Sequence, residues 1–216
     1  MTYPGLVIFD CDGVLVDSEP ISCRVLSANL VRHGLIKSPA ECEDLFVGGS
    51  MRGVQSYVRS LGIDLPGDWI DEIYAETYSA LKNGVDIVSG VPDVLDILTR
   101  QGVPFCVASN GSDEKMGITL GQNGLLERFR DAMFSAQTLG VSKPDPELFL
   151  HASKAMGVTP DRCVVVEDSL NGVTAAKRAG MRCFGYVAEG DGASLRDAGA
   201  EVFGDMAELP GLLGLD

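Results

Sequence analysis

Short strand-like runs alternate with helical stretches from residue 91 onward, and this alternation constrains the fold more than any other feature. LVIFD (6–10) and CVVVED (163–168) are apolar almost throughout, as expected of strands that are covered on both faces. Further runs of this kind are PFCVASN (104–110), DAMFSA (131–136) and RCFGYV (182–187). Strands that alternate with helices form a parallel sheet. We therefore predict an α/β protein with a doubly wound, Rossmann-like parallel sheet.

The segment 15–84 interrupts this alternation, because it reads as consecutive helices with no convincing strand among them. Ser38 and Glu41 have the spacing of a capping box at a helix start. Residues suited to a helix core recur at helical spacing, at 54, 57, 58 and 61 and again at 70, 73, 74, 77 and 81. They are expected to form the core of this segment together with Trp69. We predict that 15–84 form an inserted helical cap domain, and that 1–14 and 85–216 form the α/β domain.

The charge balance argues against two kinds of partner. Seventeen Lys and Arg against 31 Asp and Glu leave a net charge of −14, which repels nucleic-acid phosphates and anionic bilayers. We expect no nucleic acid and no membrane among the partners, and we expect a monomer. The stretch MTYPGLVIFD has neither a basic region nor a long apolar stretch, so the expected location is the cytoplasm. Six cysteines include no CxxC pair and are predicted to be buried free thiols.

Polar side chains gather where the predicted strands end. Ligands bind outside the carboxyl ends of the strands in open α/β sheets, so these side chains are expected to meet in one crevice. They are Asp10 and Asp12 after the first strand, Ser109 and Asn110 after the second, Lys143 in the loop after the third, and Glu167 and Asp168 after the fourth.

The four carboxylates in this set predict a cation. Close together in a site of low dielectric constant, they would repel one another unless protons or a cation offset their charge. Oxygen ligands without a His or Cys cluster favour Mg²⁺, which commonly shares its coordination with a phosphate oxygen. Asp10 is then available as a nucleophile that forms an acyl phosphate. Asp12 is placed to protonate the leaving oxygen and later to deprotonate the attacking water.

The remaining polar groups suit phosphoryl transfer, in which positioning and neutralisation of charge contribute most. Lys143 supplies a positive charge beside Asp10 and the transferring group. The Ser109 hydroxyl and the backbone N–H groups near Asn110 and Gly111 are expected to donate to phosphoryl oxygens.

Asp-x-Asp-Gly after the first strand, Ser after the second, Lys before a helix and Glu-Asp after a later strand occur here in that order. This order resembles the haloacid dehalogenase-like phosphatase superfamily, and the resemblance covers almost the whole chain. It implies that Asp10 is nucleophile and Mg²⁺ ligand, and that Asp12 is acid/base and a ligand through its backbone carbonyl. It implies further that Ser109 and Lys143 bind phosphate and that Asp168 is a metal ligand. Glu167 is left open as a direct ligand, a ligand through water, or no ligand.

The stretches DCDGVLVDSE (10–19) and VEDS (166–169) are similar to the subgroup that contains β-phosphoglucomutase and many sugar-phosphate phosphatases. In that subgroup a helical cap is inserted after the first motif, where 15–84 stands. The resemblance implies a mobile lid over the crevice. The cap residues Phe46, Gly48, Gly49 and Arg52 are expected to help select the substrate, with Arg52 left open as a solvated charge on a helix. The expected function is Mg²⁺-dependent hydrolysis of a small phosphate monoester, a phosphorylated metabolite of the sugar or polyol type.

Four alternatives can be told apart by features of this sequence. The dehalogenase and phosphonatase members lack the second aspartate, so Asp12 argues against both. A phosphosugar mutase of the β-phosphoglucomutase type carries a His where this chain has Ser22, and an Arg directly after Gly-x-Ser, where this chain has Met51. A phosphate-responsive binding protein is the alternative of another class, and the helical insertion argues against it because a lid suits a small substrate.

Overall fold

The computed structural model describes residues 3–46 and 49–215. The chain divides into two compact units. One unit combines the chain up to Val16 with the chain from Ile87 onward, and the other runs from Asp17 to Asp86. Each is described by itself.

The first unit is built on a six-stranded sheet with the order β5-β4-β1-β6-β7-β8. Every neighbouring pair is parallel. The strands are β1 (Leu6–Phe9), β4 (Phe105–Ser109), β5 (Met133–Ser135), β6 (Cys163–Glu167), β7 (Arg182–Tyr186) and β8 (Glu201–Phe203). The predicted α/β class with a parallel sheet is confirmed.

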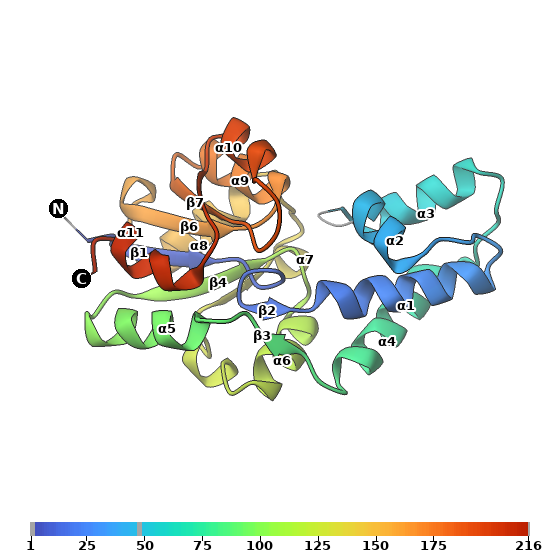
Figure 1. Ribbon diagram of the computed structural model, residues 1–216, viewed down its shortest axis with the longest axis horizontal. Helices are drawn as coiled ribbons and strands as arrows, with labels where there is room; N and C mark the ends of the chain where they lie inside the picture. Colours follow the sequence, from blue (N-terminus) through green and yellow to red (C-terminus); the bar gives the residue numbers. More distant parts are fainter. Residues whose placement is uncertain (1–2, 47–48, 216) are drawn as a thin grey trace. The chain divides into compact units, whose positions relative to one another are not determined.

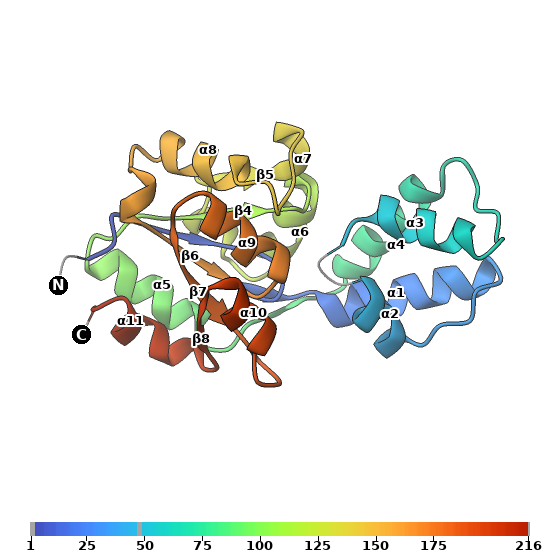
Figure 2. The same cartoon turned by 90° about the horizontal axis from the view of Figure 1, so that it is seen from above.

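Helices cover both faces of this sheet (Figures 1 and 2). Ile8 of β1 lies in a buried cluster with Phe149 and Val173, so this face packs against α8 and α9. Val7 and Phe9 are also fully buried, and alternate residues of a strand point to opposite faces. The apolar character of the strand therefore follows from cover on both sides. The helices are α5 (Val91–Arg100), α6 (Asp113–Gln122), α7 (Ala136–Leu139), α8 (Glu147–Ala155), α9 (Leu170–Arg178), α10 (Ala193–Ala198) and α11 (Leu209–Leu212), with 3₁₀ turns η1 (Leu126–Arg128), η2 (Pro160–Arg162) and η3 (Met206–Glu208).

The sequence did not reveal three short strands. β8 has three residues and pairs with β7 at the sheet edge. Three residues are too few for the alternation of apolar and polar side chains to be recognised in the sequence. β2 (Val16–Asp17) and β3 (Asp86–Ile87) pair as a separate two-stranded sheet, at the two points where the chain passes between the units. The expectation of no strand within 15–84 is therefore wrong at the start of that segment.

The second unit consists of helices α1 (Glu19–Arg32), α2 (Pro39–Phe46), α3 (Met51–Ser60) and α4 (Trp69–Leu81). The predicted capping box forms at α2, where Ser38 N–H donates to Glu41 Oε2 at 2.9 Å and Glu41 N–H donates to Ser38 Oγ at 3.2 Å. Most of the predicted apolar stripes pack into one core, in which Val58, Trp69 and Ile73 are fully buried. The prediction is wrong for Leu61, which is 50% exposed just after the end of α3.

All six cysteines are buried and free, as predicted. Within the described residues, no helix combines the length and the apolar character that crossing a membrane requires.

Asn29 is a buried polar anchor of the second unit. It is fully buried, its Oδ1 accepts from Trp69 Nε1 at 2.7 Å, and its Nδ2 donates to Glu72 Oε1 at 3.0 Å. We expect Asn29→Ala to lower the free energy of unfolding by about 1–3 kcal/mol, because the buried indole N–H loses its acceptor. Trp69 is the single tryptophan of the chain, so its fluorescence in a denaturant titration reports on this unit.

Asn83→Ala is the matched control, since the Asn83 side chain is exposed and its amide donates to the Ser79 carbonyl at 3.2 Å. Its effect should stay within about 0.5 kcal/mol. Equal effects of the two variants would show that the buried hydrogen bond does not stabilise the unit.

Candidate active site

The register of the sheet brings the strand ends together. Phe9 of β1 pairs with Val107 of β4 on one side and with Val166 of β6 on the other. The residues that follow these strands therefore leave the sheet at the same edge. Asp10 is fixed there, because its N–H donates to the Val166 carbonyl at 2.9 Å.

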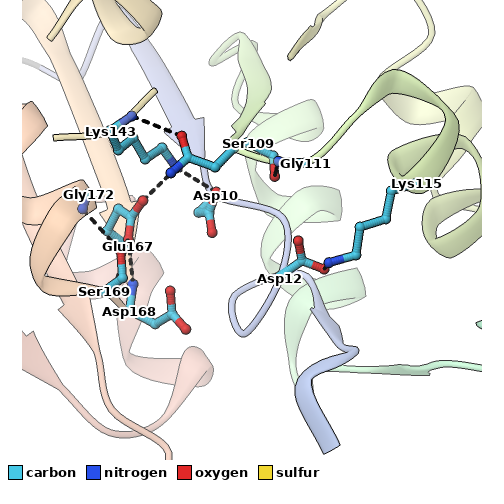
Figure 3. A network of polar contacts seen from close by, with 11 residues as sticks. Asp10, Asp12, Ser109, Gly111, Lys115, Lys143, Glu167, Asp168, Ser169 and Gly172 are labelled. Carbon is cyan, nitrogen blue, oxygen red and sulfur yellow. Dashed lines mark hydrogen bonds and ion pairs between the residues drawn. The ribbon is translucent and has the colours of Figure 1, made fainter. Parts of the chain in front are cut away.

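Lys143 reaches this edge from the loop after α7 and joins two of the carboxylates. Its Nζ lies 2.5 Å from Asp10 Oδ1 and 2.6 Å from Glu167 Oε1, with its side chain 2% exposed (Figure 3). The Phe149 ring centroid lies 5.0 Å from the same nitrogen. Burial opposes the charged ammonium, but the attraction of Asp10 and Glu167 outweighs it and raises the pKa of Lys143. Lys143 is therefore a fixed positive charge between the two carboxylates.

Glu167 has several partners besides Lys143. Its Oε2 accepts from the backbone N–H of Asp168 at 3.1 Å, and from both the N–H and the hydroxyl of Ser169, at 3.0 and 2.9 Å. A Cβ atom on Gly172 would lie 1.8 Å from the Glu167 carboxyl carbon. The carboxylate is thus seated against the first turn of α9, which only a glycine at 172 permits.

Asp168 lies against the loop that follows β1. Gly13 has a φ of 75°, and a Cβ atom there would lie 1.9 Å from Asp168 Oδ2. Gly13 therefore serves two requirements, a left-handed backbone conformation and the close approach of the Asp168 carboxylate, which follows β6.

Asp10, Glu167 and Asp168 form a group suited to a metal ion. Each offers one carboxylate oxygen, and these atoms all lie within 4.8 Å of one another. Burial raises the pKa of Asp10 to about 7 despite the attraction of Lys143, and the negative charges of Glu167 and Asp12 act in the same direction. A buried all-oxygen set with excess negative charge fits a hard divalent cation such as Mg²⁺.

Ser109 and Gly111 form the turn after β4. Gly111 N–H donates to Ser109 Oγ at 2.9 Å, which leaves the hydroxyl proton of Ser109 available to a ligand. The side chain of Asn110 has a different task, since its Oδ1 accepts from the backbone N–H of Lys143 at 2.9 Å. Asn110 therefore fixes the loop that carries the lysine.

Asp12 pairs with a residue that the sequence did not single out. Lys115 Nζ lies 2.8 Å from Asp12 Oδ1, and both side chains are 19% exposed (Figure 3). The available signal was a lysine in the first turn of a helix that starts shortly after Ser109, a position that the helix dipole disfavours unless an anion is near.

The substrate-selecting residues predicted from the cap belong to the second unit. Arg52 lies in the first turn of α3, which the Ser50 side chain caps by accepting from Gly53 N–H at 3.2 Å. Gly49 precedes this cap, and Gly48 lies outside the described residues. Roles for Gly48, Gly49 and Arg52 remain predictions.

Comparison with known proteins identifies the family. The family model for haloacid dehalogenase-like hydrolases matches residues 4–180. The chain belongs to this family. It is 32% identical to the 6-phosphogluconate phosphatase of Escherichia coli K12 over 208 residues, which cover 95% of this chain and 93% of that protein.

Solved structures of family members share the fold over nearly the whole chain. A conserved haloacid dehalogenase-like protein from Agrobacterium tumefaciens is 37% identical with a TM-score of 0.84, and 97% of each chain is covered. A hydrolase of the family from Deinococcus radiodurans, solved with phosphate and sodium bound, is 32% identical with a TM-score of 0.82, over 99% of this chain and 98% of that one. The enzyme is thus a haloacid dehalogenase-like hydrolase.

The seat of Glu167 gives a structural prediction for this hydrolase. Gly172→Ala would place a methyl group on the Glu167 carboxylate, and we expect it to lower the free energy of unfolding by about 1–3 kcal/mol. Gly117→Ala is the control, because a Cβ atom in that helix has no neighbour within 4 Å. It should be neutral or stabilising by up to about 1 kcal/mol. Thermal unfolding of both variants measures the difference, and a stable Gly172→Ala protein would contradict the close packing of Glu167.

Proposed function

We propose that this hydrolase is a Mg²⁺-dependent phosphatase that hydrolyses a small phosphate monoester of the sugar or polyol type through an aspartyl-phosphate intermediate. The observation that carries the proposal is the buried Asp10 carboxylate, held by Lys143 within a group of carboxylates that suits a cation. The similarity to 6-phosphogluconate phosphatase supports the substrate class.

Asp10 is the nucleophile in this proposal. Lys143 binds Asp10 Oδ1, which orients the carboxylate, so that its oxygen attacks the phosphorus atom and the ester bond breaks. Asp12 gives a proton to the departing alcohol oxygen. A water molecule then attacks the phosphorus of the acyl phosphate, Asp12 takes up its proton, and inorganic phosphate leaves with Asp10 restored.

The other residues bind and orient the phosphoryl group. The Ser109 hydroxyl donates to a phosphoryl oxygen, and Lys143 offsets its charge. Asp10 and Asp168 would hold Mg²⁺, with the Asp12 carbonyl as a further ligand, and the cation would neutralise phosphoryl charge and favour an in-line approach. Glu167 holds Lys143 through Oε1 and belongs to the same group of carboxylates that suits the cation.

Phosphate release tests the proposal. We expect release from sugar and polyol phosphates with Mg²⁺, none with EDTA, and a loss of at least about a thousand-fold in kcat for Asp10→Asn, as for removal of other covalent nucleophiles. Asp161→Asn removes an exposed carboxylate outside the site and should leave the rate unchanged.

The same assay separates the alternatives. Interconversion of hexose 1- and 6-phosphates without net phosphate release would indicate a mutase. Phosphate release that persists in Asp10→Asn would refute the aspartyl-phosphate route. An absence of both reactions, with phosphate still bound, would favour a non-catalytic phosphate-responsive protein.

Metal and proton should compete for Asp10. Without metal, burial raises the pKa of Asp10 to about 7, above its ordinary value. The Asp10 carboxylate therefore becomes protonated as the pH falls through 7, and it can then neither attack nor bind a metal. The Mg²⁺ concentration for half-maximal activity should therefore rise by about tenfold for each pH unit below 7, as one proton is displaced. Titrations of Mg²⁺ between pH 5.5 and 8 measure this. A metal requirement independent of pH would exclude the competition.

A further inference from the structure

Lys115 is the second ammonium of the active site, and its surroundings differ from those of Lys143. Lys143 contacts two carboxylates and its side chain is 2% exposed. Of the residues that the structure describes, Asp12 alone forms an ion pair with Lys115, whose side chain is 19% exposed. A lysine ammonium carries three N–H donors. Two donors of Lys115 therefore remain for a ligand, at a position that a ligand can reach.

The Lys115 side chain runs beside the groups that handle the ester. A Cβ atom on Gly111 would lie 3.2 Å from Ser109 Oγ, 3.4 Å from Lys115 Cδ and 3.7 Å from Asp12 Oδ2. All three side chains thus surround one point of the backbone. Figure 3 shows Lys115 approaching Asp12 from the side opposite to Lys143. Lys143 therefore contacts the proposed nucleophile Asp10, and Lys115 contacts Asp12, the residue proposed to protonate the departing alcohol.

The geometry of proton transfer limits where the leaving group lies. A group that protonates the ester oxygen must come within about 2.6–3.2 Å of it. Lys115 Nζ is 2.8 Å from Asp12 Oδ1, so substituents one or two carbons from the ester oxygen come within reach of this flexible side chain.

The local electrostatics favour an anionic substituent. Burial lowers the pKa of Lys115, but the attraction of Asp12 outweighs this effect and raises that pKa, so the ammonium stays charged. Lys115 also lies in the first turn of the ten-residue helix α6, where the helix dipole favours an incoming anion. Asp113 and Glu114 of the same turn are exposed, and Asp113 accepts a hydrogen bond from Thr138 Oγ1, so neither carboxylate pairs with Lys115.

We propose that Lys115 binds a carboxylate on the leaving group, so that the preferred substrates are phosphate esters of small hydroxy acids or sugar acids and not of neutral polyols. This inference rests on the proposed phosphatase function and narrows its substrate class. Lys115 then determines the specificity for the leaving group, because its ammonium forms a stronger hydrogen bond with a carboxylate than with a hydroxyl group.

Two matched substrate pairs test the inference. Phosphoglycolate is compared with 2-hydroxyethyl phosphate, and 3-phosphoglycerate with glycerol 3-phosphate, in wild type and in Lys115→Gln, with Mg²⁺ present. In at least one pair we expect wild type to prefer the acid in kcat/KM, and Lys115→Gln to reduce that preference by about 10- to 100-fold. The loss should appear mainly in KM of the acid.

Lys154→Gln is the control, because it removes an exposed lysine of α8 outside the site; it should keep the preference. Equal losses for both members of each pair would overturn the inference, since they would assign Lys115 to Asp12 or to the phosphoryl group. Wild type that shows no preference for the acid in either pair would also overturn it. If wild type released phosphate from no ester at all, including p-nitrophenyl phosphate, the proposed function itself would fail.

Discussion

The buried contact of Lys143 with Asp10 and Glu167 is the interaction on which the site depends. Three ionisable groups lie at the end of a sheet with almost no access to water, a costly arrangement unless each charge has partners. Lys143 supplies two contacts, of 2.5 and 2.6 Å. Removal of the lysine would leave two carboxylates side by side, so this contact makes the acidic crevice compatible with a stable sheet.

The surrounding structure holds this contact in place. Asn110 fixes the Lys143 loop through a backbone hydrogen bond, and Ser169 and Gly172 hold the Glu167 carboxylate from the other side. These positioning groups come from the turn after β4 and from the start of α9, which are separate in sequence. The result is preorganisation: the Asp10 carboxylate, the proposed nucleophile, is oriented before a substrate arrives, so little reorganisation is left to the proposed reaction.

The two lysines divide the charges of the site between them. Lys143 is enclosed and has two carboxylate partners, one of them the proposed nucleophile Asp10, whereas Lys115 is partly exposed and has Asp12 as its ion-pair partner. In the proposed scheme, a partly exposed lysine such as Lys115 selects the substrate, and the buried carboxylates with Lys143 carry out the reaction. Fold and chemistry are then separable from specificity, since they depend on different residues.

The sequence by itself determined the parallel sheet, the helical insertion and the set of polar residues at the strand ends. It did so because the spacing of apolar residues, the apolar runs and the helix start signals are local properties of the chain. Tertiary structure decided which partner each polar group takes. Asp10 and Lys143 are 133 residues apart, so strand order and register bring them together. The same holds for Lys115 beside Asp12, for Asn110 as a loop anchor and for the two close glycine contacts. A local pattern cannot specify such pairings, since the distances that define them exist only after the strands are aligned.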